Sequence, residues 1–341
     1  MLQVKMPEAY KIDMLDVPVP AIKANEVLIN MKRLGICGSD IQVYHGKHKY
    51  MRFPVVQGHE GAGVIVKTGE KAEGLSVGDK VTIQPQVFCG KCYPCQIGHY
   101  NVCEHLKVFG IHEPGMASEY FAAEASKVIK LPQDMSFDQG AMVEPAAVAV
   151  GAVRRCGDIE GNNILVLGAG TIGNLAAQTA QACGADKVMI TDINSKRLDI
   201  AGDCGIEYCI NTKEKDIGDA ISEIFEDRKA DVIIDCAGVK TTIDQAINNA
   251  RRASKIVVVG NFKEPVEIEM PLLQRREIDM IGIMMYVKED FEEAIRLMQE
   301  GKVKTEKLIT DYYRIRDFKQ AYEYIDHHME DVMKVMLTFE A

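Results

Sequence analysis

Four cysteines in one short segment of the chain, FCGKCYPCQIGHYNVC, could hold a metal ion together: Cys89, Cys92, Cys95 and Cys103. Two residues separate each of the first three, and seven more precede the fourth. Four thiolates at this spacing can converge on one zinc ion in tetrahedral geometry. Because they fill the tetrahedron and leave no open position, the segment predicts a structural zinc site that pins a loop without its own hydrophobic core.

Two other kinds of site also use four cysteines. A zinc ribbon that binds nucleic acid normally carries basic residues, whereas this chain has a formal net charge of −10. An iron–sulfur site of the ferredoxin kind follows the spacing C-x2-C-x2-C-x3-C, which this segment does not. Structural zinc is therefore the favoured interpretation.

A catalytic zinc needs mixed ligands and one open position. The candidates are Cys37 in GICGSD, His59 and Glu60 in QGHEGAG, and Glu144 in VEPAAV. Taken singly, each also fits a purely structural role, as a buried thiol, a core histidine or a carboxylate at the start of a helix. The residue types alone therefore leave a second metal site undecided.

A glycine-rich turn, Gly168-Ala-Gly170-Thr171-Ile172-Gly173, follows an apolar run and opens a helix-like stretch. Glycines in this pattern permit a tight turn, the close approach of a pyrophosphate, and close contact between helix and strand. The first N–H groups of the helix have no partner within the helix and can bind the phosphates. The segment therefore predicts a dinucleotide-binding turn.

A carboxylate, Asp192, ends the next apolar run, roughly 20 residues beyond the last glycine. At this place it would accept the ribose hydroxyls and repel a 2′-phosphate, which favours NAD over NADP. Arg197 complicates the choice, because a nearby guanidinium could hold a phosphate. NAD remains the expected coenzyme, because Asp192 takes the ribose position itself.

Two kinds of domain are needed to position these residues. Residues 1 to about 145 contain short β-branched runs, such as EVLINMKRLG, GAGVIVKTG and DKVTIQP, each bounded by turn residues. They predict a compact β-rich domain. Further along, apolar runs alternate with helix-like stretches, of which 171–185 and 241–253 are examples, and the alternation predicts an α/β fold with a parallel, doubly wound sheet of six strands. The apolar runs are residues 163–167, 187–191, 231–235, 255–259 and 279–284.

The alternation stops near residue 287. Two helical segments, 290–302 and 317–329, and a closing strand at 334–339 follow. This tail is too short for a domain of its own, so we expect it to pack back on the first domain. The expected organisation is 1–146 for the catalytic domain, 147–286 for the coenzyme domain and 287–341 for the returning segment.

Bulk properties exclude several classes of protein. A chain of 341 residues exceeds one comfortable core, which agrees with two domains. An apolar fraction of 47% and a charged fraction of 26% are typical of soluble globular proteins. No apolar run approaches the ~20 residues of a membrane span, and no secretory signal is recognisable, so a cytoplasmic location is expected. The acidic balance argues against binding to nucleic acid or to anionic membranes.

Several motifs together resemble one family, the medium-chain zinc-dependent alcohol dehydrogenases. GHEGAGVIVKTGEKA with the later GDKV resembles its zinc signature, GICGSD its first ligand segment, and CGKCYPCQIGHYNVC its structural-zinc lobe. GAGTIG with ITDINSKR matches its coenzyme turn, and VEPAAVAVGAVRR is similar to the polyol (sorbitol-type) branch. The likeness runs along essentially the whole chain. It implies a GroES-like catalytic domain interrupted by a Rossmann coenzyme domain.

The resemblance implies a role for each matching position. Cys37 and His59 match ligands of the catalytic zinc. Glu60 matches an acidic residue that binds this metal or lies just behind it, and Glu144 a glutamate that approaches it directly or through water. The four clustered cysteines match the ligands of a structural zinc. Ser39, two residues after Cys37, is placed as the first hydroxyl of a proton relay, although a serine in a turn is the simpler interpretation.

The chemistry that follows is the oxidation of an alcohol. Zinc in an open site acts as a Lewis acid that lowers the pKa of an alcohol, and the hydride passes to the nicotinamide of NAD. Many relatives continue the proton relay with a histidine where this chain has Gln42, which cannot titrate. In polyol dehydrogenases an Arg-Tyr pair contacts the substrate. The matching positions here are Met285 and Tyr286, so only the tyrosine is kept.

The leading hypothesis is a zinc- and NAD-dependent dehydrogenase that oxidises a secondary alcohol of a polyol or sugar derivative. A sugar acid (aldonate) or L-threonine is the alternative substrate. The basic segment HGKHKYMR, residues 45–52, could attract a carboxylate or phosphate, although a solvated, charged loop is the simpler interpretation. A non-catalytic, zinc-stabilised nucleotide-binding protein is the alternative from another class. The resemblance also implies a homodimer or a homotetramer.

Overall fold

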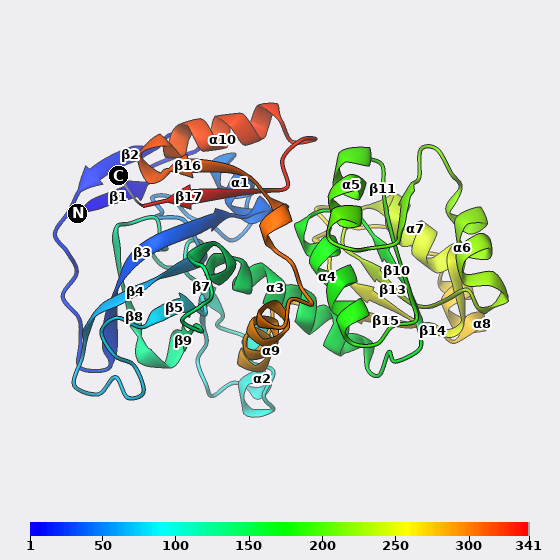
Figure 1. Cartoon of the computed structure of the whole chain (residues 1–341), viewed down its shortest axis with the longest axis horizontal. Helices are drawn as coiled ribbons and strands as arrows, with labels where there is room; N and C mark the ends of the chain where they lie inside the picture. Colours follow the sequence, from blue (N-terminus) through cyan, green and yellow to red (C-terminus); the bar gives the residue numbers. More distant parts are fainter. Residues whose placement is uncertain (340–341) are drawn as a thin grey trace. The chain divides into compact units, whose positions relative to one another are not determined.

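The computed structural model describes residues 1–339 and divides the chain into two compact units. The first contains Met1–Glu144 and the chain from Ile309 onward, and the second contains Pro145–Leu308. In Figure 1 the blue to green start of the chain and its orange to red end therefore belong to one unit, and the chain between them, from green through yellow to the orange α9, forms the other.

The first unit is built on a seven-stranded sheet with the order β16-β17-β3-β4-β5-β9, in which β8 also pairs with β3. Its longest strand, β3, pairs antiparallel with β17, β4 and β8. The strands are β3 (Glu26–Ile36), β4 (Glu60–Thr68), β5 (Lys80–Ile83), β8 (Tyr120–Glu124), β9 (Val128–Lys130), β16 (Ile309–Arg314) and β17 (Lys334–Thr338). The three β-branched runs that predict a β-rich domain correspond to β3, β4 and β5.

Small elements complete this unit. They are β1 (Leu2–Lys5), β2 (Asp13–Asp16), α1 (Gly38–Tyr44), β6 (Gln86–Val87), α2 (Tyr93–Gln96), β7 (Lys107–Val108) and α10 (Phe318–His327), with short 3-10 turns at Tyr100–Val102, Ala125–Lys127 and Ile315–Asp317. β1 pairs with β2, and β6 pairs with β7.

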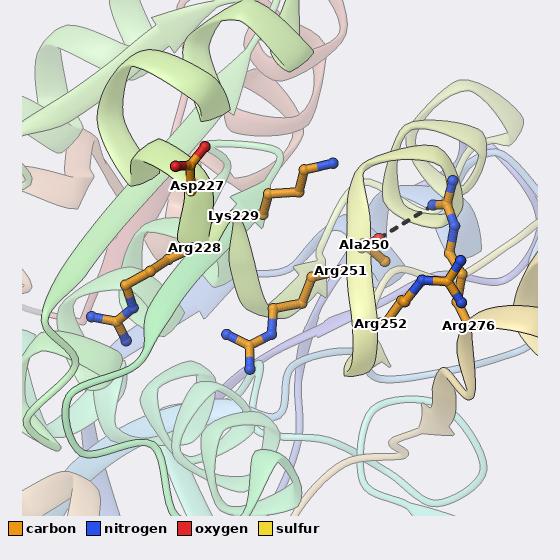
Figure 2. A pocket seen from close by; sticks show the side chains of 7 residues that line it. All are labelled: Asp227, Arg228, Lys229, Ala250, Arg251, Arg252 and Arg276. Carbon is orange, nitrogen blue, oxygen red and sulfur yellow. Dashed lines mark hydrogen bonds between the residues drawn. The ribbon is translucent and has the colours of Figure 1, made fainter.

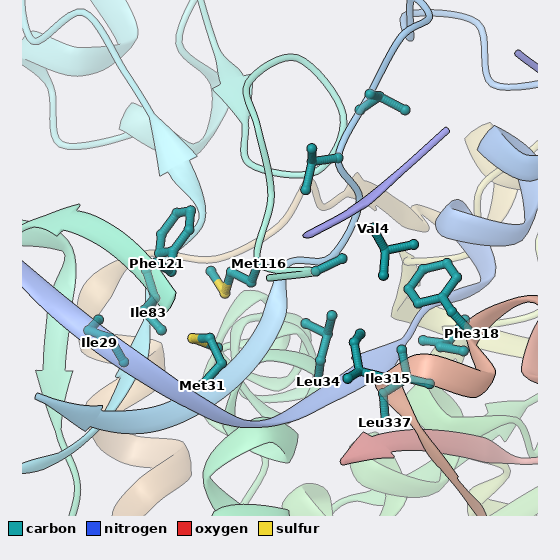
Figure 3. Packing of buried hydrophobic residues seen from close by; sticks show 14 of the residues in the cluster. Val4, Ile29, Met31, Leu34, Ile83, Met116, Phe121, Ile315, Phe318 and Leu337 are labelled. Carbon is teal, nitrogen blue, oxygen red and sulfur yellow. The ribbon is translucent and has the colours of Figure 1, made fainter. Parts of the chain in front are cut away.

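The hydrophobic core of the first unit joins its two sequence segments. Ile29, Met31 and Leu34 of β3 share one buried cluster with Phe318 of α10 and Leu337 of β17. Figure 3 shows these side chains gathered around the crossing strands. The C-terminal segment therefore contributes to the core of the first unit, as the sequence predicts.

The second unit contains a six-stranded parallel sheet with the order β12-β11-β10-β13-β14-β15. All five residues of β10 are buried, as expected for a strand covered on both faces. The strands are β10 (Asn163–Leu167), β11 (Lys187–Asp192), β12 (Tyr208–Asn211), β13 (Ala230–Asp235), β14 (Ala250–Val258) and β15 (Asp279–Gly282). The predicted α/β class with a doubly wound parallel sheet is confirmed.

Helices connect these strands. They are α3 (Phe137–Cys156), α4 (Thr171–Ala182), α5 (Ser195–Asp203), α6 (Ile217–Phe225), α7 (Lys240–Asn249), α8 (Met270–Arg276) and α9 (Lys288–Gln299), with 3-10 turns η3 (Glu226–Arg228) and η4 (Glu306–Leu308). Helix α3 begins in the first unit and ends in the second. None of the helices in the described residues is both long and apolar enough to cross a membrane.

Two details differ from the sequence-based expectations. Residues 250–253 are the first residues of β14 and not the end of a helix, because α7 ends at Asn249. The returning segment begins at Ile309 and not at 287, because α9 belongs to the second unit. There the guanidinium of Arg154 in α3 holds Asp290 of α9 through two hydrogen bonds of 2.7 and 3.0 Å.

Candidate active site

The four clustered cysteines come together as a possible metal site. Their sulfur atoms lie within 4.8 Å of one another, with Sγ–Sγ distances of 3.4 Å (Cys92–Cys95), 3.7 Å (Cys92–Cys103) and 3.6 Å (Cys89–Cys103). Ligands at the usual zinc–sulfur distance in a tetrahedron are about 3.8 Å apart. The spacing of the sulfurs therefore fits one zinc ion.

The electrostatics of the cluster also favour a cation. Backbone N–H groups of Lys91 and Cys92 lower the pKa of Cys89 to about 6, which makes its thiolate available at neutral pH. Burial and the neighbouring sulfurs of Cys92 and Cys103 raise the pKa of Cys95 to about 12. Four thiolates this close repel one another, so the four thiols do not all ionise without a cation. A bound divalent ion offsets this repulsion.

A second group of possible ligands contains Cys37, His59 and Glu60, whose ligand atoms also lie within 4.8 Å of one another. The sheet explains why they meet. Cys37 directly follows β3, Glu60 begins β4, and these two strands pair with Gly35 opposite Glu60. One thiol, one imidazole and one carboxylate are a donor set that zinc accepts in open sites.

Asp40, the last residue of the motif GICGSD, is not among the predicted ligands but supports both Cys37 and His59. Its Oδ2 accepts a hydrogen bond of 2.9 Å from the backbone N–H of Cys37, and its Oδ1 lies 3.4 Å from Nδ1 of His59. Burial alone lowers the pKa of His59, but the carboxylate of Asp40 and the Cys37 side chain outweigh burial and raise this pKa well above its usual value. A carboxylate behind a ligating imidazole is a common feature of metal sites, because it fixes the ring.

A buried lysine, Lys334, holds the Glu60 carboxylate. Its Nζ donates to both carboxylate oxygens at 2.7 and 2.6 Å and to the carbonyl of Ile36 at 3.2 Å. Both side chains of the ion pair are almost fully buried, with 4% and 2% exposed. A Cβ at Gly35 would collide with Glu60 Oε2, so this position has room only for glycine. The sequence alone does not reveal Lys334, because it lies 274 residues from Glu60 and no local motif marks it.

Replacing Lys334 with methionine is expected to lower the free energy of unfolding of the first unit by about 3–5 kcal/mol, because Glu60 is left as a buried, unpaired charge. Urea unfolding followed by fluorescence would measure the loss. Lys334→Arg keeps the charge and serves as the control. The double variant Glu60→Gln with Lys334→Met should regain part of the stability. Equal stability of Lys334→Met and the parent chain would contradict the role of this pair.

Three other predicted site residues are Ser39 and Glu144 in the first unit and Tyr286 in the second. Ser39 is half-buried in the first turn of α1. Glu144 is buried, and its negative charge helps to raise the pKa of Lys334, but among the described residues it is not in the group with Cys37. Tyr286 is buried, and its ring packs edge-on against Phe291 with centroids 4.9 Å apart. The catalytic roles of these three residues remain predictions.

The glycine-rich turn has the geometry expected of a phosphate cradle. Gly168 follows β10 with φ of 97°, and Gly170 is the N-cap of α4. A Cβ at Gly170 would meet nothing within 4 Å, so its backbone faces open space. A Cβ at Gly173 would collide with the carbonyl oxygen of Gly168, which explains the third glycine.

Asp192 is fixed at this turn. Its Oδ2 accepts a hydrogen bond of 2.7 Å from the N–H of Ala169, and its Oδ1 accepts one of 2.9 Å from the N–H of Asn194. Arg197 lies half-buried in the following helix, α5. The carboxylate is therefore positioned next to the glycine-rich turn by the strand end that carries it, as the sequence predicts.

A parallel six-stranded sheet with a dinucleotide turn, joined to a β-rich unit with two groups of zinc ligands, defines a two-domain metal-dependent oxidoreductase. Comparison with protein families makes this specific. Residues 23–133 match the model described as Alcohol dehydrogenase GroES-like domain, and residues 171–300 match the model described as Zinc-binding dehydrogenase. The chain belongs to the zinc-type alcohol dehydrogenase family and is a dehydrogenase.

Individual relatives cover nearly the whole chain. A sorbitol dehydrogenase of Halalkalibacterium halodurans is 35% identical over 94% of each chain. The crystal structure of the alcohol dehydrogenase RspB from Escherichia coli CFT073, complexed with NADH, is 31% identical, with a TM-score of 0.91 over 99% of each chain. Galactitol-1-phosphate dehydrogenase from E. coli is 29% identical, with a TM-score of 0.92 over 99% of this chain and 100% of that one. The resemblance found in the sequence is confirmed.

Proposed function

We propose that this protein is an NAD-dependent dehydrogenase that oxidises a secondary alcohol of a polyol or sugar derivative with the help of a catalytic zinc. The observation that carries the proposal is the group of Cys37, His59 and Glu60, which is supported from behind by Asp40 and Lys334. Zinc bound there would supply a Lewis acid for the alcohol, and NAD would accept the hydride. The four-cysteine group would hold a second, structural zinc.

The surrounding residues would position the ligands and move a proton. Asp40 fixes the imidazole of His59, and Lys334 fixes the carboxylate of Glu60, so both donors keep one orientation. Ser39, two residues after Cys37, would pass the alcohol proton outward. Gln42 cannot continue the transfer, and the next histidine, His45, is bonded to Asp326 at 2.9 Å. Water is therefore the expected next carrier.

NAD is the coenzyme that the turn favours, because Asp192 would accept the ribose hydroxyls. Asp192→Asn is expected to raise the KM for NAD about 10- to 100-fold, since a hydrogen bond to a charged group contributes about 1.5–3 kcal/mol. It should raise activity with NADP as well, because the repulsion of the 2′-phosphate is removed. Initial rates with both coenzymes would measure the change. An unaltered preference would show that another group selects the coenzyme, and Arg197→Gln in the same background tests that residue as the phosphate holder.

A specific observation favours a negatively charged substrate as the second candidate. Lys47, Lys49 and Arg52 are exposed on the segment after α1, and among the described residues none of them has a carboxylate partner. His48 on the same segment is half-buried, and its Nδ1 has no hydrogen-bond partner. Burial and then the charge of His112 lower its pKa, and the smaller effects of Asp40 and His59 place the segment near these two residues. A carboxylate or phosphate on the substrate could pair with this segment.

A substrate screen would decide between these candidates. Polyols, aldonates, phosphorylated polyols and L-threonine would be offered with NAD to the zinc-loaded protein, and NADH would be followed by its absorbance. Turnover of neutral polyols supports the first candidate, and turnover of the charged compounds supports the second. No turnover in any group would overturn both.

The protein is also expected to form homodimers or homotetramers. The outer strand β15 leaves one edge of the parallel sheet without a neighbour among the described strands. Met280 on this strand and Met284 just after it are exposed. An unpaired edge with apolar side chains favours pairing with a second copy.

A further inference from the structure

A basic pocket lies at the end of the parallel sheet where the strands begin. It is a cavity of about 490 Å³, and Figure 2 shows the side chains that line it. They come from η3 and the residue after it, from the start of β14 and from the end of α8. The lining residues are Asp227, Arg228, Lys229, Ala250, Arg251, Arg252 and Arg276.

The pocket is separate from the coenzyme turn. Ala230 and Ala250, the first residues of β13 and β14, are paired with each other. The pocket therefore lies at the end of the sheet where the strands have their amino ends. Gly168 follows the last residue of β10, so the glycine-rich turn lies at the carboxyl ends of the strands. In a parallel sheet the amino ends and the carboxyl ends of the strands lie on opposite sides.

Two of the cations keep the pocket in shape. Arg276 donates from Nη1 to the carbonyls of Ile247, Asn248 and Ala250 at 2.9–3.2 Å, which caps the end of α7, and Figure 2 draws the last of these bonds. Arg251 pairs with Asp231, the second residue of β13. Each guanidinium has five N–H donors, so both keep donors for another partner.

Two other cations have no carboxylate partner among residues 1–339. Lys229 makes no side-chain hydrogen bond or ion pair there, and Arg252 only donates from Nη1 to the carbonyl of Arg275 at 3.0 Å. Both side chains are exposed at the pocket. Five cations and one carboxylate thus line a cavity in a chain whose net charge is −10, and of the five only Arg228 and Arg251 pair, within the part of the chain that the structure describes, with carboxylates outside the lining, Asp186 and Asp231. Concentrated like charges repel one another, and a bound anion relieves the repulsion.

The backbone around the pocket is also held in an uncommon conformation. Six non-glycine residues in the described chain have positive φ, and four of them flank this pocket: Glu226, Lys229, Ala253 and Glu277. Such conformations cost free energy and are concentrated at functional sites. Here the four residues with positive φ direct the neighbouring basic segments toward the same cavity.

We propose that this pocket binds the phosphate group of a small metabolite. Guanidinium forks match the geometry of phosphate oxygens, and a lysine adds a point charge. The volume exceeds the need of a free phosphate ion and is within the range of pockets that hold small organic ligands. The site is distinct from that of the dehydrogenase reaction, and it gives the protein a place to sense a phosphorylated compound.

The test uses the full-length, zinc-loaded protein, titrated calorimetrically with inorganic phosphate and with glucose 6-phosphate at constant ionic strength. Glucose and potassium chloride are the control titrants. We expect binding of both phosphate compounds and at least a tenfold weaker affinity in the double variant Lys229→Gln with Arg252→Gln. Tighter binding of glucose 6-phosphate than of phosphate would identify an organic ligand, and equal affinity would identify free phosphate. Turnover without added phosphate should be unchanged.

A matched control removes two charges elsewhere. Lys67 and Lys71 are exposed in the first unit and have no ion-pair partner among the described residues, so Lys67→Gln with Lys71→Gln should bind as the parent does. Repeating the titration with saturating NADH separates the pocket from the coenzyme turn. Unchanged affinity in the pocket variant, equal loss in the control variant, or displacement by NADH would overturn the proposal. None of these outcomes depends on turnover of a particular alcohol.

Discussion

Replacing Cys37 with serine is expected to lower kcat/KM by about 1,000-fold or more. A hydroxyl is a poor substitute for a thiolate as a zinc ligand, and a Lewis acid contributes several kcal/mol to such a reaction. Metal analysis should find one zinc per chain fewer than in the parent protein. Binding of NADH, followed by its fluorescence, should be retained, because the coenzyme turn belongs to the other unit.

Cys209→Ser is a suitable control for Cys37→Ser. Cys209 is a half-buried thiol in β12 that belongs to neither group of zinc ligands. Its replacement should leave both the zinc content and the turnover unchanged. A Cys37→Ser protein with full turnover, or one that loses the metal of the four-cysteine group instead, would contradict the assignment of the catalytic zinc.

Replacing Cys92 with serine is expected to destabilise the segment around it and leave the chemistry of the other zinc site in place. The segment 89–103 contains only a short helix, α2, and a 3-10 turn, and only Cys103 of its cysteines is buried, so it has little core of its own. Binding of structural zinc contributes directly to folding. We expect about 3 kcal/mol or more of lost stability in this segment.

Limited proteolysis and thermal unfolding would measure this loss. Cleavage should concentrate between residues 86 and 108, and a chelator that removes zinc from the parent protein should give the same cleavage pattern. Cys183→Ser, which alters an exposed thiol outside both groups, provides the matched control. If Cys92→Ser resists protease as the parent does, the four cysteines do not hold a structural ion.

The fold can be predicted where the pattern of apolar residues is strong. Buried parallel strands such as β10 and β13 are continuous apolar runs, and the sequence locates both to within one residue. The same pattern does not reveal β12, because its residues Tyr208–Asn211 are each only half-buried at the edge of the sheet. The start of β14 resembles a helix because its alanines and arginines favour helices, and pairing with β13 overrides that preference.

The site can be predicted where its ligands lie in local motifs. Cys37, His59 and the four clustered cysteines have types and spacings that indicate their chemistry, and the structure brings each set together. Lys334 lies in no such motif, and Asp40, although it is part of GICGSD, has no spacing that indicates its role. Lysines at strand ends and aspartates at helix starts are usually solvated, and only the fold shows that these two residues face Glu60 and His59.

The interrupted layout of the first unit has a consequence for synthesis on the ribosome. β17 lies next to β3 inside the seven-stranded sheet, yet the whole second unit separates the two strands along the chain. The second unit is complete in sequence by Leu308, so it can fold while the first still lacks two strands and the lysine that neutralises Glu60. A nascent chain can therefore complete its parallel sheet before Lys334 reaches Glu60, and a chain that stopped before residue 334 would leave this buried carboxylate without its lysine.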